Sequence, residues 1–495
     1  MFGNLQLSTL CLSLKIRQGD AKDVWVRVIC VMSKQKKQHR LKHRSKAGPS
    51  LGNLDDVLPY NEQVVLAESL RTRPPKAIRM RLPQAYGSAN NGSLPFGSEP
   101  VPWYPNGLFC GETHQPGRFL EHAAGVYFVQ DAGSMLALRL LDIQPHEWVA
   151  DICAAPGGKA SAILEKVGPG SGFLLANEPI RGRLPSLEFN LARVGFPRYC
   201  ITSKDPERLD VQLIKQFDAV LVDAPCTGQM LVGRGKQSIA AFSKSQIAHS
   251  AARQQRIVSA ASQLVRPGGR LVYSTCTFAP DENEEVIEAF LATHGGWCIE
   301  TISELKQWQT PRSPGGYRLY PHRDRCAGAY AVRLRLAGDI STNQVGTSKR
   351  GMKVEPLVLG KETVGSTQGG CRVQQVHRWE ELPKEIERRL KIPCGRLSEI
   401  AYRPAKQWLP SHELALRRDE HWKPAAIYEL GDHDAQQFML GLSLPAGPFG
   451  WVVATWQGHP LGWLRGNKER LNNRLPASAR LGFVPLLRSS DSGNL

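Results

Sequence analysis

The chain has 495 residues, 41% of them hydrophobic, which is the apolar content of a soluble globular protein with two or three domains. Lys and Arg number 63 against 45 acidic residues, and this net charge of +18 favours nucleic acid over an acidic metabolite as the partner. No apolar run is long enough to span a bilayer, and residues 5–14 lack the pattern of a signal peptide, so membrane insertion and secretion are not expected.

The cysteines indicate a reducing compartment. Eleven are scattered through the chain without a C-x-x-C pair or Cys/His spacing of the zinc type. A chain of this length does not need disulfide staples, so we expect reduced thiols, a cytoplasmic location and no metal site. His39, His43 and His322 stand beside Lys or Arg in polar runs, which is typical of exposed histidine.

The N-terminal part, residues 1–57, is predicted to be a basic and disordered leader. Its segment 34–46 (KQKKQHRLKHRSK) holds seven Lys or Arg and no acid, so it can lie on phosphates, with a plain solubilising tail as the alternative. Met32 directly precedes this segment and offers a natural start, which gives the hypothesis that residues 1–31 are not part of the native protein.

Residues 58–145 are predicted to form a small accessory domain. A helix-like NEQVVLAESL (61–70) and a basic, strand-like AIRMRL (77–82) precede loops rich in Gly, Pro and Asn, with VPWYP at 101–105.

Residues 146–336 alternate between short apolar runs and amphipathic stretches. The runs WVADIC, GFLLANE, RYCITS, FDAVLVDAP and RLVYSTC are separated by helix-like KASAILEKV, SLEFNLARV and IAHSAARQQRIVSAASQLV. Strands and helices in strict turn predict an α/β fold with a parallel sheet covered on both faces. A last pair, GGYRLYPH and GAYAVRLRL, predicts an antiparallel hairpin at the sheet edge.

The C-terminal third is predicted to be a separate, β-rich unit. Residues 337–375 are poor in aromatics and rich in Gly, Ser and Thr, which predicts a linker. Residues 376–495 contain the β-like runs GPFGWVVATWQG and HPLGWLRG and a basic KERLNNRLPASARL segment.

The segment DICAAPGGK (151–159) predicts a strand, a tight loop and a helix start. Gly157 and Gly158 let a ligand approach the backbone, and the helix N-terminus favours an anionic group. A phosphate-binding P-loop is excluded because Cys153 stands where its first Gly belongs. A carboxylate-bearing ligand such as the methionine end of S-adenosylmethionine fits better, with a merely structural turn as the alternative.

Two acidic residues follow the next strands in register with this loop. Glu178 ends the second predicted strand, where a carboxylate can accept hydrogen bonds from a ribose diol, and Asp205 ends the third. Either acid alone is more often a helix cap or a surface residue. In register with the glycine loop, both are predicted to border the ligand crevice.

Two cysteines, Cys226 in DAPCTG and Cys276 in YSTCTF, follow buried strands. They are 50 residues apart, which is one helix with its loops, so neighbouring strands bring them to the same sheet edge as Asp223. A catalytic thiol needs a cationic or polar neighbour, which Lys159 can supply. Together the residues suggest covalent chemistry on an electron-poor ring, and their spacing leaves open which thiol attacks.

These motifs together resemble the Fmu/Sun family of RNA cytosine-5 methyltransferases. The resemblance runs through FVQDAGSMLALRLLDIQP, DICAAPGGK, DAPCTG, RPGGRLVYSTCTFAPDENE and YRLYPHRDRCAGAYAVRL. The C-terminal GWVVATWQGHPLGWLRGNKERLNNRLPASAR is similar to the PUA-like RNA-binding domain of bacterial small-subunit rRNA methylases of the RsmF type. The resemblance implies a Rossmann-like S-adenosylmethionine-dependent fold and RNA as the partner of the accessory and C-terminal domains.

The resemblance also implies a role for each site residue. Cys276 would attack C6 of the cytosine, and Cys226 would assist loss of the C5 proton and release of the product. Asp223 would hydrogen-bond the cytosine edge, with Lys159 pointing into the same pocket. The cofactor would lie along the loop and the acidic residues, with Glu178 on its ribose and Asp205 near its adenine; this predicted set is Ala154, Ala155, Pro156, Gly157, Gly158, Lys159, Glu178, Asp205 and Asp223.

The substrate implied by the resemblance is an unpaired or flipped cytosine in ribosomal RNA, with the small ribosomal subunit as an expected partner and a monomer as the expected state of the protein. The alternatives are tRNA as substrate, or an RNA-binding or ribosome-assembly factor without catalysis. Thr227 replaces the usual Ser of the family, and two segments depart more from its pattern: 229–236 and the run Arg79-Met80-Arg81-Leu82. Both segments are expected to contact RNA.

Overall fold

The structure is a computed structural model, and it describes residues 54–82, 94, 96, 98–111, 113–209, 211–312, 315–338, 354–359, 362–368, 396–397, 401–402, 409–420 and 422–487. The basic segment 34–46 and the hypothesis about residues 1–31 lie outside these residues. The chain divides into two compact units, Met1–Gly48 and Pro49–Leu495, and only the second is described below. No helix in the described ranges is long and apolar enough to cross a membrane.

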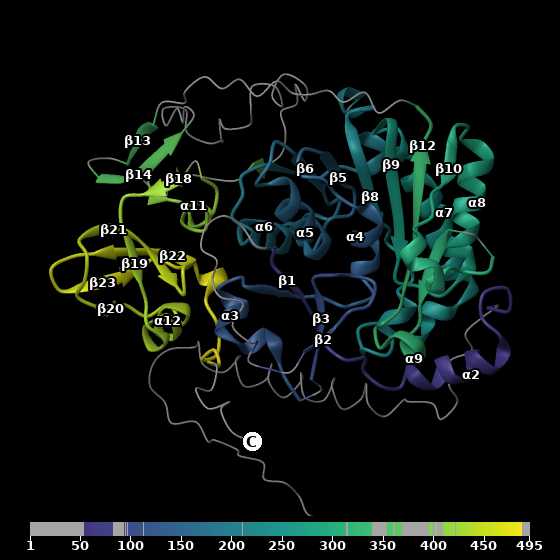
Figure 1. Ribbon diagram of the computed structural model, residues 1–495, viewed down its shortest axis with the longest axis horizontal. Coiled ribbons are helices and arrows are strands. Elements are labelled where there is room, and N and C mark those ends of the chain that lie inside the picture. The colour runs from purple at the N-terminus through teal and green to yellow at the C-terminus, as the bar shows by residue number, and fades with distance from the viewer. Residues whose placement is uncertain are drawn as a thin grey trace, which may run out of the picture. The chain divides into compact units, whose positions relative to one another are not determined.

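The accessory region contains a helix and a small antiparallel sheet with the order β2-β3-β1-β4 (Figure 1). The predicted helix at 61–70 and strand at 77–82 are confirmed, because α2 and β1 occupy these positions, whereas the sequence did not predict the other strands. The elements are α2 (Tyr60–Ser69), β1 (Ala77–Met80), β2 (Ser98–Pro100), β3 (Gly107–Cys110), α3 (Leu120–Ala123) and β4 (Tyr127–Val129).

Two arginines of the basic run hold this small sheet against the larger domain. Arg79 is 1% exposed and donates to Ser161 (2.9 Å), Gln130 (3.0 Å) and Glu165. Arg81 donates to the backbone oxygen of Val194. The expectation that this run contacts RNA is therefore wrong for Arg79, because β1 is an inner strand whose Arg79 side chain points into the protein.

The catalytic region is built on parallel strands in the order β9-β8-β5-β6-β7, as the alternating sequence predicted (Figure 1). Alternate residues of these strands pack in two separate clusters, one shared with α4, α5 and α6 and the other with α7 and α8, so both faces are covered. The strands are β5 (Trp148–Asp151), β6 (Phe173–Asn177), β7 (Tyr199–Thr202), β8 (Phe217–Asp223) and β9 (Val265–Thr275). The helices are α4 (Met135–Leu141), α5 (Gly158–Val167), α6 (Leu184–Ala192), α7 (Lys244–Ser262) and α8 (Glu284–Thr293).

The strand order reverses at β5, between β8 and β6. In an open α/β sheet, ligands bind at such a switch point, outside the carboxyl ends of the strands. The glycine loop follows β5 and the two cysteines follow β8 and β9, so every predicted site residue comes from this end of the sheet.

The predicted antiparallel pair at the end of the catalytic region is confirmed, but its position differs. Strand β12 (Ala329–Leu336) pairs with β9 on one side and with β11 (Gly316–Leu319) and β10 (Trp297–Ile299) on the other. It is therefore an inner strand of the sheet, because β11 pairs with its first half and β10 with its last residues, while β9 pairs along its other edge. The short α9 (Pro321–Asp324) joins β11 to β12, and β15 (Arg396–Leu397) pairs with β7 at the opposite edge.

The C-terminal unit is β-rich, as predicted. Its main sheet has the order β19-β21-β22-β23-β20, with α12 (Asp432–Met439) contributing Phe438 and Met439 to the core. These strands are β19 (Ile427–Glu429), β20 (Leu444–Pro445), β21 (Gly450–Trp456), β22 (His459–Gly466) and β23 (Arg470–Asn473). The remaining elements are β13 (Val354–Leu359), β14 (Glu362–Gln368), β16 (Ala401–Tyr402), β17 (Leu409–Pro410), α11 (His412–Ala415) and β18 (Trp422–Pro424).

The segment predicted as a linker contains paired strands. Strands β13 and β14 pair with each other, and β14 also pairs with β18 of the C-terminal unit. Val364 is fully buried there, which explains why this Gly- and Thr-rich sequence takes a strand conformation. The rest of 337–375, apart from residues 337 and 338, lies outside the described residues.

Candidate active site

The glycine loop makes a sharp turn between β5 and α5 that only glycine accommodates at one position. Gly157 has φ of 109°, and a Cβ there would stand 2.9 Å from the Cβ of Asn190 on α6. The Asn190 side chain donates to the Pro156 carbonyl (2.8 Å), and Ala154 N–H donates to the Asn177 carbonyl (2.9 Å). The loop is thus held from two sides, with its backbone at the sheet edge.

Glu178 lies against this loop, at the end of β6. Its carboxylate accepts from the backbone N–H of Ala155 (3.3 Å) and from that of Ile180 (2.9 Å) and pairs with Arg183 (3.1 Å). Asp205 comes three residues after β7, is exposed and caps the 3₁₀ turn Pro206–Arg208 by accepting from Glu207 N–H (3.0 Å). The structure therefore brings Glu178 to the loop, whereas no contact joins Asp205 to it within the described residues.

Asn177, which the sequence analysis did not single out, fixes these strand ends relative to one another. Its fully buried amide donates to the carbonyls of Ile152 (3.1 Å) and Lys204 (2.9 Å), and its oxygen accepts from Thr202 (2.8 Å). One side chain therefore links the ends of β5, β6 and β7.

Asp151 is a second residue that sequence reasoning missed. It ends β5, is 1% exposed, and neither carboxylate oxygen has a hydrogen-bond partner among the described residues. Burial, reinforced by repulsion from Asp223, raises the pKa of Asp151 to about 8. An acid directly before a glycine-rich loop was the available signal. A buried carboxylate without a partner beside a ligand loop is suited to a cationic ligand group.

The two cysteine sulfurs face each other. Cys226 Sγ and Cys276 Sγ are 3.2 Å apart, and Cys276 N–H donates to Cys226 Sγ (3.3 Å). Strands β8 and β9 are direct neighbours with Asp223 opposite Ser274, so the predicted convergence is confirmed. The hydrogen bond to Cys276, followed by burial, raises the pKa of Cys226 well above its usual range. The hydrogen bond between the two sulfurs can be donated by either thiol.

A cavity of about 130 Å³ lies beside Cys276. Lys159 donates to Asp223 across it (2.7 Å), and the Ser274 hydroxyl donates to the other oxygen of the same carboxylate (2.7 Å). Burial alone would lower the pKa of Lys159, but Asp223 more than offsets this and raises it, with a contribution from Cys276. Residues around the cavity include Asp131, Ser134, Lys159, Asp223, Leu231, Arg234, Ser274, Cys276, Gly328 and Tyr330.

The buried carboxylate of Glu282 forms hydrogen bonds with both loops that carry the cysteines. It accepts from the backbone N–H of Thr227 (2.9 Å), from the Thr277 hydroxyl (3.2 Å) and from the Gln254 amide (2.9 Å), and the Thr227 hydroxyl bonds to it as well. Thr227 follows Cys226 and Thr277 follows Cys276. Glu282 is fully buried, so this one side chain sets the two loops relative to each other.

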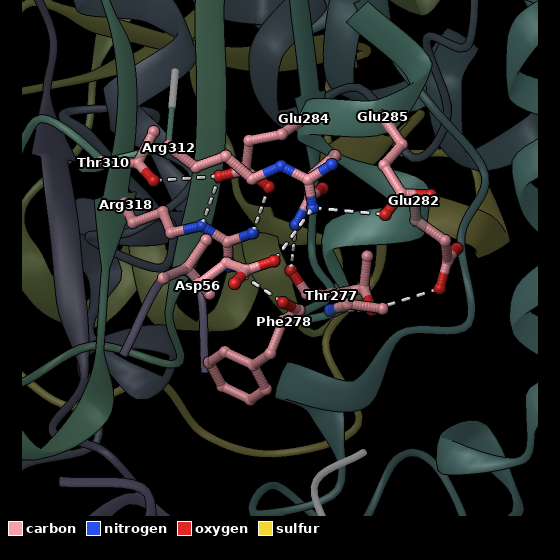
Figure 2. Close-up of polar contacts among 12 residues, drawn as sticks. Asp56, Thr277, Phe278, Glu282, Glu284, Glu285, Thr310, Arg312 and Arg318 are labelled. Atoms are coloured by element: carbon pink, nitrogen blue, oxygen red, sulfur yellow. Dashed lines mark hydrogen bonds and ion pairs between the residues drawn. The ribbon is translucent and has the colours of Figure 1, made fainter. Parts of the chain in front are cut away.

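The next two residues extend this support. Asn283 joins Thr275 (2.5 Å) to the Thr277 carbonyl (2.9 Å), on either side of Cys276. Figure 2 shows that the Glu284 carboxylate accepts hydrogen bonds from the Thr310 hydroxyl (3.0 Å) and from the Arg318 guanidinium (2.8 Å). The Arg318 guanidinium also donates to the Phe278 carbonyl (2.9 Å). Sequence reasoning missed this role. The signal was a run of acids, DENEE, inside an otherwise apolar segment.

Part of the segment 229–236 lines the cavity beside Cys276. Gln229 and Met230 are buried, and the Gln229 side chain accepts from Phe278 N–H (3.0 Å), so their expected contact with RNA is wrong. Arg234 borders the cavity and pairs with Asp131. Lys236 is exposed.

Comparisons with known proteins agree with this architecture. Residues 138–335 match the family of 16S rRNA methyltransferase RsmB/F, and residues 425–481 match the methyltransferase RsmF PUA domain. The ribosomal RNA small subunit methyltransferase F of Enterobacter sp. (strain 638) is 30% identical over 406 residues, which cover 76% of this chain and 83% of that protein. The chain belongs to the RsmB/F methyltransferase family.

Curated relatives that extend over most of the chain carry the name of the RsmF branch. Methyltransferase F of Salmonella agona (strain SL483) is 29% identical over 414 residues, covering 76% of this chain and 84% of the relative. The crystal structure of NSun6 from Pyrococcus horikoshii with SFG has a TM-score of 0.50 at 19% identity, over 58% of this chain and 97% of that one, and shows the fold. The predicted Rossmann-like methyltransferase fold and the PUA domain are confirmed, and the RsmB/F protein is an RNA methyltransferase.

Proposed function

We propose that this RsmB/F protein transfers a methyl group from S-adenosylmethionine to C5 of a cytosine in ribosomal RNA, through a covalent bond between C6 and Cys276. The observation that carries the proposal is the asymmetry of the sulfur pair. Cys276 borders the cavity with Asp223 and Lys159, whereas Cys226 is not among the residues around it. Only Cys276 therefore faces a space that a base can enter.

The cofactor end of the sheet has features that fit S-adenosylmethionine, which supplies an activated methyl group when bound. The loop at Ala154, Ala155, Pro156, Gly157 and Gly158 lies at the sheet edge, where Pro156 is exposed and Gly158 is half-buried and has no side chain to cover its backbone. The unpartnered Asp151 carboxylate suits the ammonium group of the amino-acid end. Glu178 would hold the ribose, and Asp205 would lie near the adenine, as the family resemblance implies.

The target cytosine would enter the cavity as a single unpaired or flipped base. Asp223 is the residue to hold its N3 and N4 edge, because its carboxylate is 36% exposed while Lys159 and Ser274 fix its orientation. Lys159 donates to Asp223 and places a positive charge close to Cys276. Such fixed charges stabilise the charge that develops on the ring during attack.

The sulfur pair also suggests the order of proton movements. Cys276 adds to C6 as the thiolate, C5 then gains the methyl group, and the C5 proton must leave before the C6–sulfur bond can break. Cys226 is held as a thiol chiefly by its hydrogen bond with Cys276. Once Cys276 is bonded to carbon it carries no negative charge, so Cys226 can lose its proton and act as the base.

The other units are proposed to position the RNA. The accessory domain at 58–145 and the PUA domain within 376–495 would bind the RNA around the catalytic domain at 146–336. Relatives over most of this chain are named for the small-subunit ribosomal RNA, which favours that substrate over tRNA. We further propose a monomer located in the cytoplasm and acting on RNA of the small subunit.

Methyl transfer to RNA tests this function directly. Purified protein is incubated with labelled S-adenosylmethionine and ribosomal RNA or small subunits, and the RNA is digested to nucleosides. The proposal predicts label in 5-methylcytidine, and no label above background for Cys276→Ala. Label at another atom, or binding of RNA without transfer by the wild type, would contradict it. Bisulfite sequencing of RNA from cells with and without the gene then identifies the cytosine.

A further inference from the structure

Three arginines from separate parts of the chain meet around Gly125, directly after α3. Arg81 follows β1, Arg193 follows α6, and Arg418 follows α11. Nη1 of Arg81 and Nη2 of Arg418 lie 3.5 and 3.9 Å from the point where a Cβ on Gly125 would stand. Like charges are therefore concentrated in one small region, away from the cysteine site.

The hydrogen-bond acceptors of these arginines are neutral. Arg81 donates to the carbonyls of Gly125 and Val194, Arg193 to that of His122, and Arg418 to that of Ala124 (3.0 Å). Arg418 also donates to the His459 ring (3.1 Å), a neutral acceptor because burial lowers the pKa of His459 to about 3.

Among the described residues, the carboxylate of Glu165 acts on all three arginines through its charge but pairs with none of them. None of the three arginines forms an ion pair there, and the neighbouring carboxylate of Glu165 is already bonded to Arg79. Burial lowers the pKa of Arg81 and of Arg193 to about 10, and the charge of Glu165 opposes this shift in both. Repulsion from Arg79 adds to the lowering at Arg81, and repulsion from Arg81 adds to it at Arg193. They nevertheless stay charged at neutral pH, and half-buried positive charges that lie close together without an ion pair are unfavourable to a fold.

A cavity of about 30 Å³ borders Arg193 and Arg418, with Phe189, His412 and Leu461 also around it. Nε of Arg418 and Nδ1 of His412 are buried and have no hydrogen-bond partner among the described residues. A cavity of this size exceeds what one water needs, so it can admit a single small ion. It therefore combines guanidiniums without an ion pair, an unused N–H donor at Arg418 Nε and free space.

We propose that this cavity, here called the arginine site, binds one small anion, either a free inorganic ion such as chloride or phosphate or a phosphate group of the RNA backbone. The ligand lies where the accessory region, α6 and the C-terminal unit meet, and Arg418 N–H already donates to the Gly195 carbonyl at this junction (2.9 Å). Binding neutralises part of the repulsion and stabilises the junction. The proposal does not depend on the cysteine chemistry.

Thermal unfolding of the full chain tests for a free anion. The melting temperature is measured in chloride or phosphate against isethionate, an anion too bulky for the cavity, at constant ionic strength. The wild type is expected to gain about 1–3 °C in the small anion. Arg418→Gln and Arg193→Gln are expected to lose this gain. Arg256→Gln is the matched control, because Arg256 is exposed and paired with Glu207 (3.0 Å), and should keep it.

Two further measurements make the result independent of how well the variants fold. Crystals of wild-type protein soaked in bromide should show an anomalous peak beside Arg418 and Arg193. If the anion is instead an RNA phosphate, melting is insensitive to the anion, chloride competes with RNA, and Arg418→Gln binds RNA about five- to tenfold more weakly than Arg256→Gln. The proposal is overturned if the soaked crystals show no peak and the wild type and Arg418→Gln respond alike to both chloride and RNA.

Discussion

Two groups of charged side chains, one buried and one half-buried, differ in how completely they are paired. Beneath the cysteine loops, Glu282 and Glu284 receive hydrogen bonds on both carboxylate oxygens, and Glu284 pairs with the equally buried Arg318. At the arginine site, the guanidiniums contact neutral acceptors and leave Arg418 Nε unused. The complete network fixes the geometry of a reaction site. The incomplete one retains capacity for a ligand.

The largest difference is expected from matched substitutions in the two groups. Arg318→Met leaves Glu284 buried without its charge partner, and such a change costs about 3–5 kcal/mol of unfolding free energy. Arg418→Met removes one of several repelling charges and bonds to neutral acceptors, so about 1 kcal/mol or less is expected. Urea denaturation of both variants measures the contrast. Equal losses would show that the arginine site is no less satisfied than the carboxylate network.

Glu282→Gln sharpens the comparison at the cysteine site. The amide keeps the size of the side chain but cannot accept every hydrogen bond from Thr227, Thr277 and Gln254, so the cysteine loops lose their fixed separation. We expect methyl transfer about 10–100-fold slower at saturating RNA, because misplacing reacting groups has effects of this size. Glu285→Gln is the control, since Glu285 is exposed and pairs only with Arg312. A kcat for Glu282→Gln equal to that of the control would show that Glu282 has no positioning role.

A smaller effect is expected at Asp151, the unpaired acid of the cofactor loop. Its pKa of about 8 in the fold is above the ordinary carboxyl value, so the folded state binds the proton more tightly than the unfolded state. Its contribution to stability is therefore full below pH 4 and decreases as the pH rises to 8. Asp151→Asn removes this dependence, so the ligand-free variant should gain about 1–2 kcal/mol over the wild type between pH 5 and 6. A constant difference across that range would contradict the raised pKa.

The sequence predicted those parts of the site that depend on order along the chain. Parallel strands bring their carboxyl ends together, so the positions of Lys159, Asp223, Cys226 and Cys276 followed from alternation alone. Glu178 was predicted beside the loop for the same reason, and it lies there.

Features that depend on contacts between distant segments were not predictable in this way. The basic strand at 77–82 reads as a surface feature, but Arg79 finds Glu165 more than eighty residues later and becomes buried. Strand β12 lies inside the sheet because β9 pairs with one of its edges and β10 and β11 pair with the other, and these pairings are not visible in the sequence pattern. The role of Glu282 requires Thr227, 55 residues earlier, to be its neighbour.

The central claim is that Cys276 attacks the base and Cys226 releases it. Its most direct test is the amount of protein bonded to RNA after incubation with S-adenosylmethionine, measured on denaturing gels for Cys226→Ala and Cys276→Ala. The account predicts that Cys226→Ala accumulates a covalent complex, because the C5 proton is not removed, and that Cys276→Ala forms none. A covalent complex with Cys276→Ala, and none with Cys226→Ala, would contradict the account and exchange the roles of the two thiols.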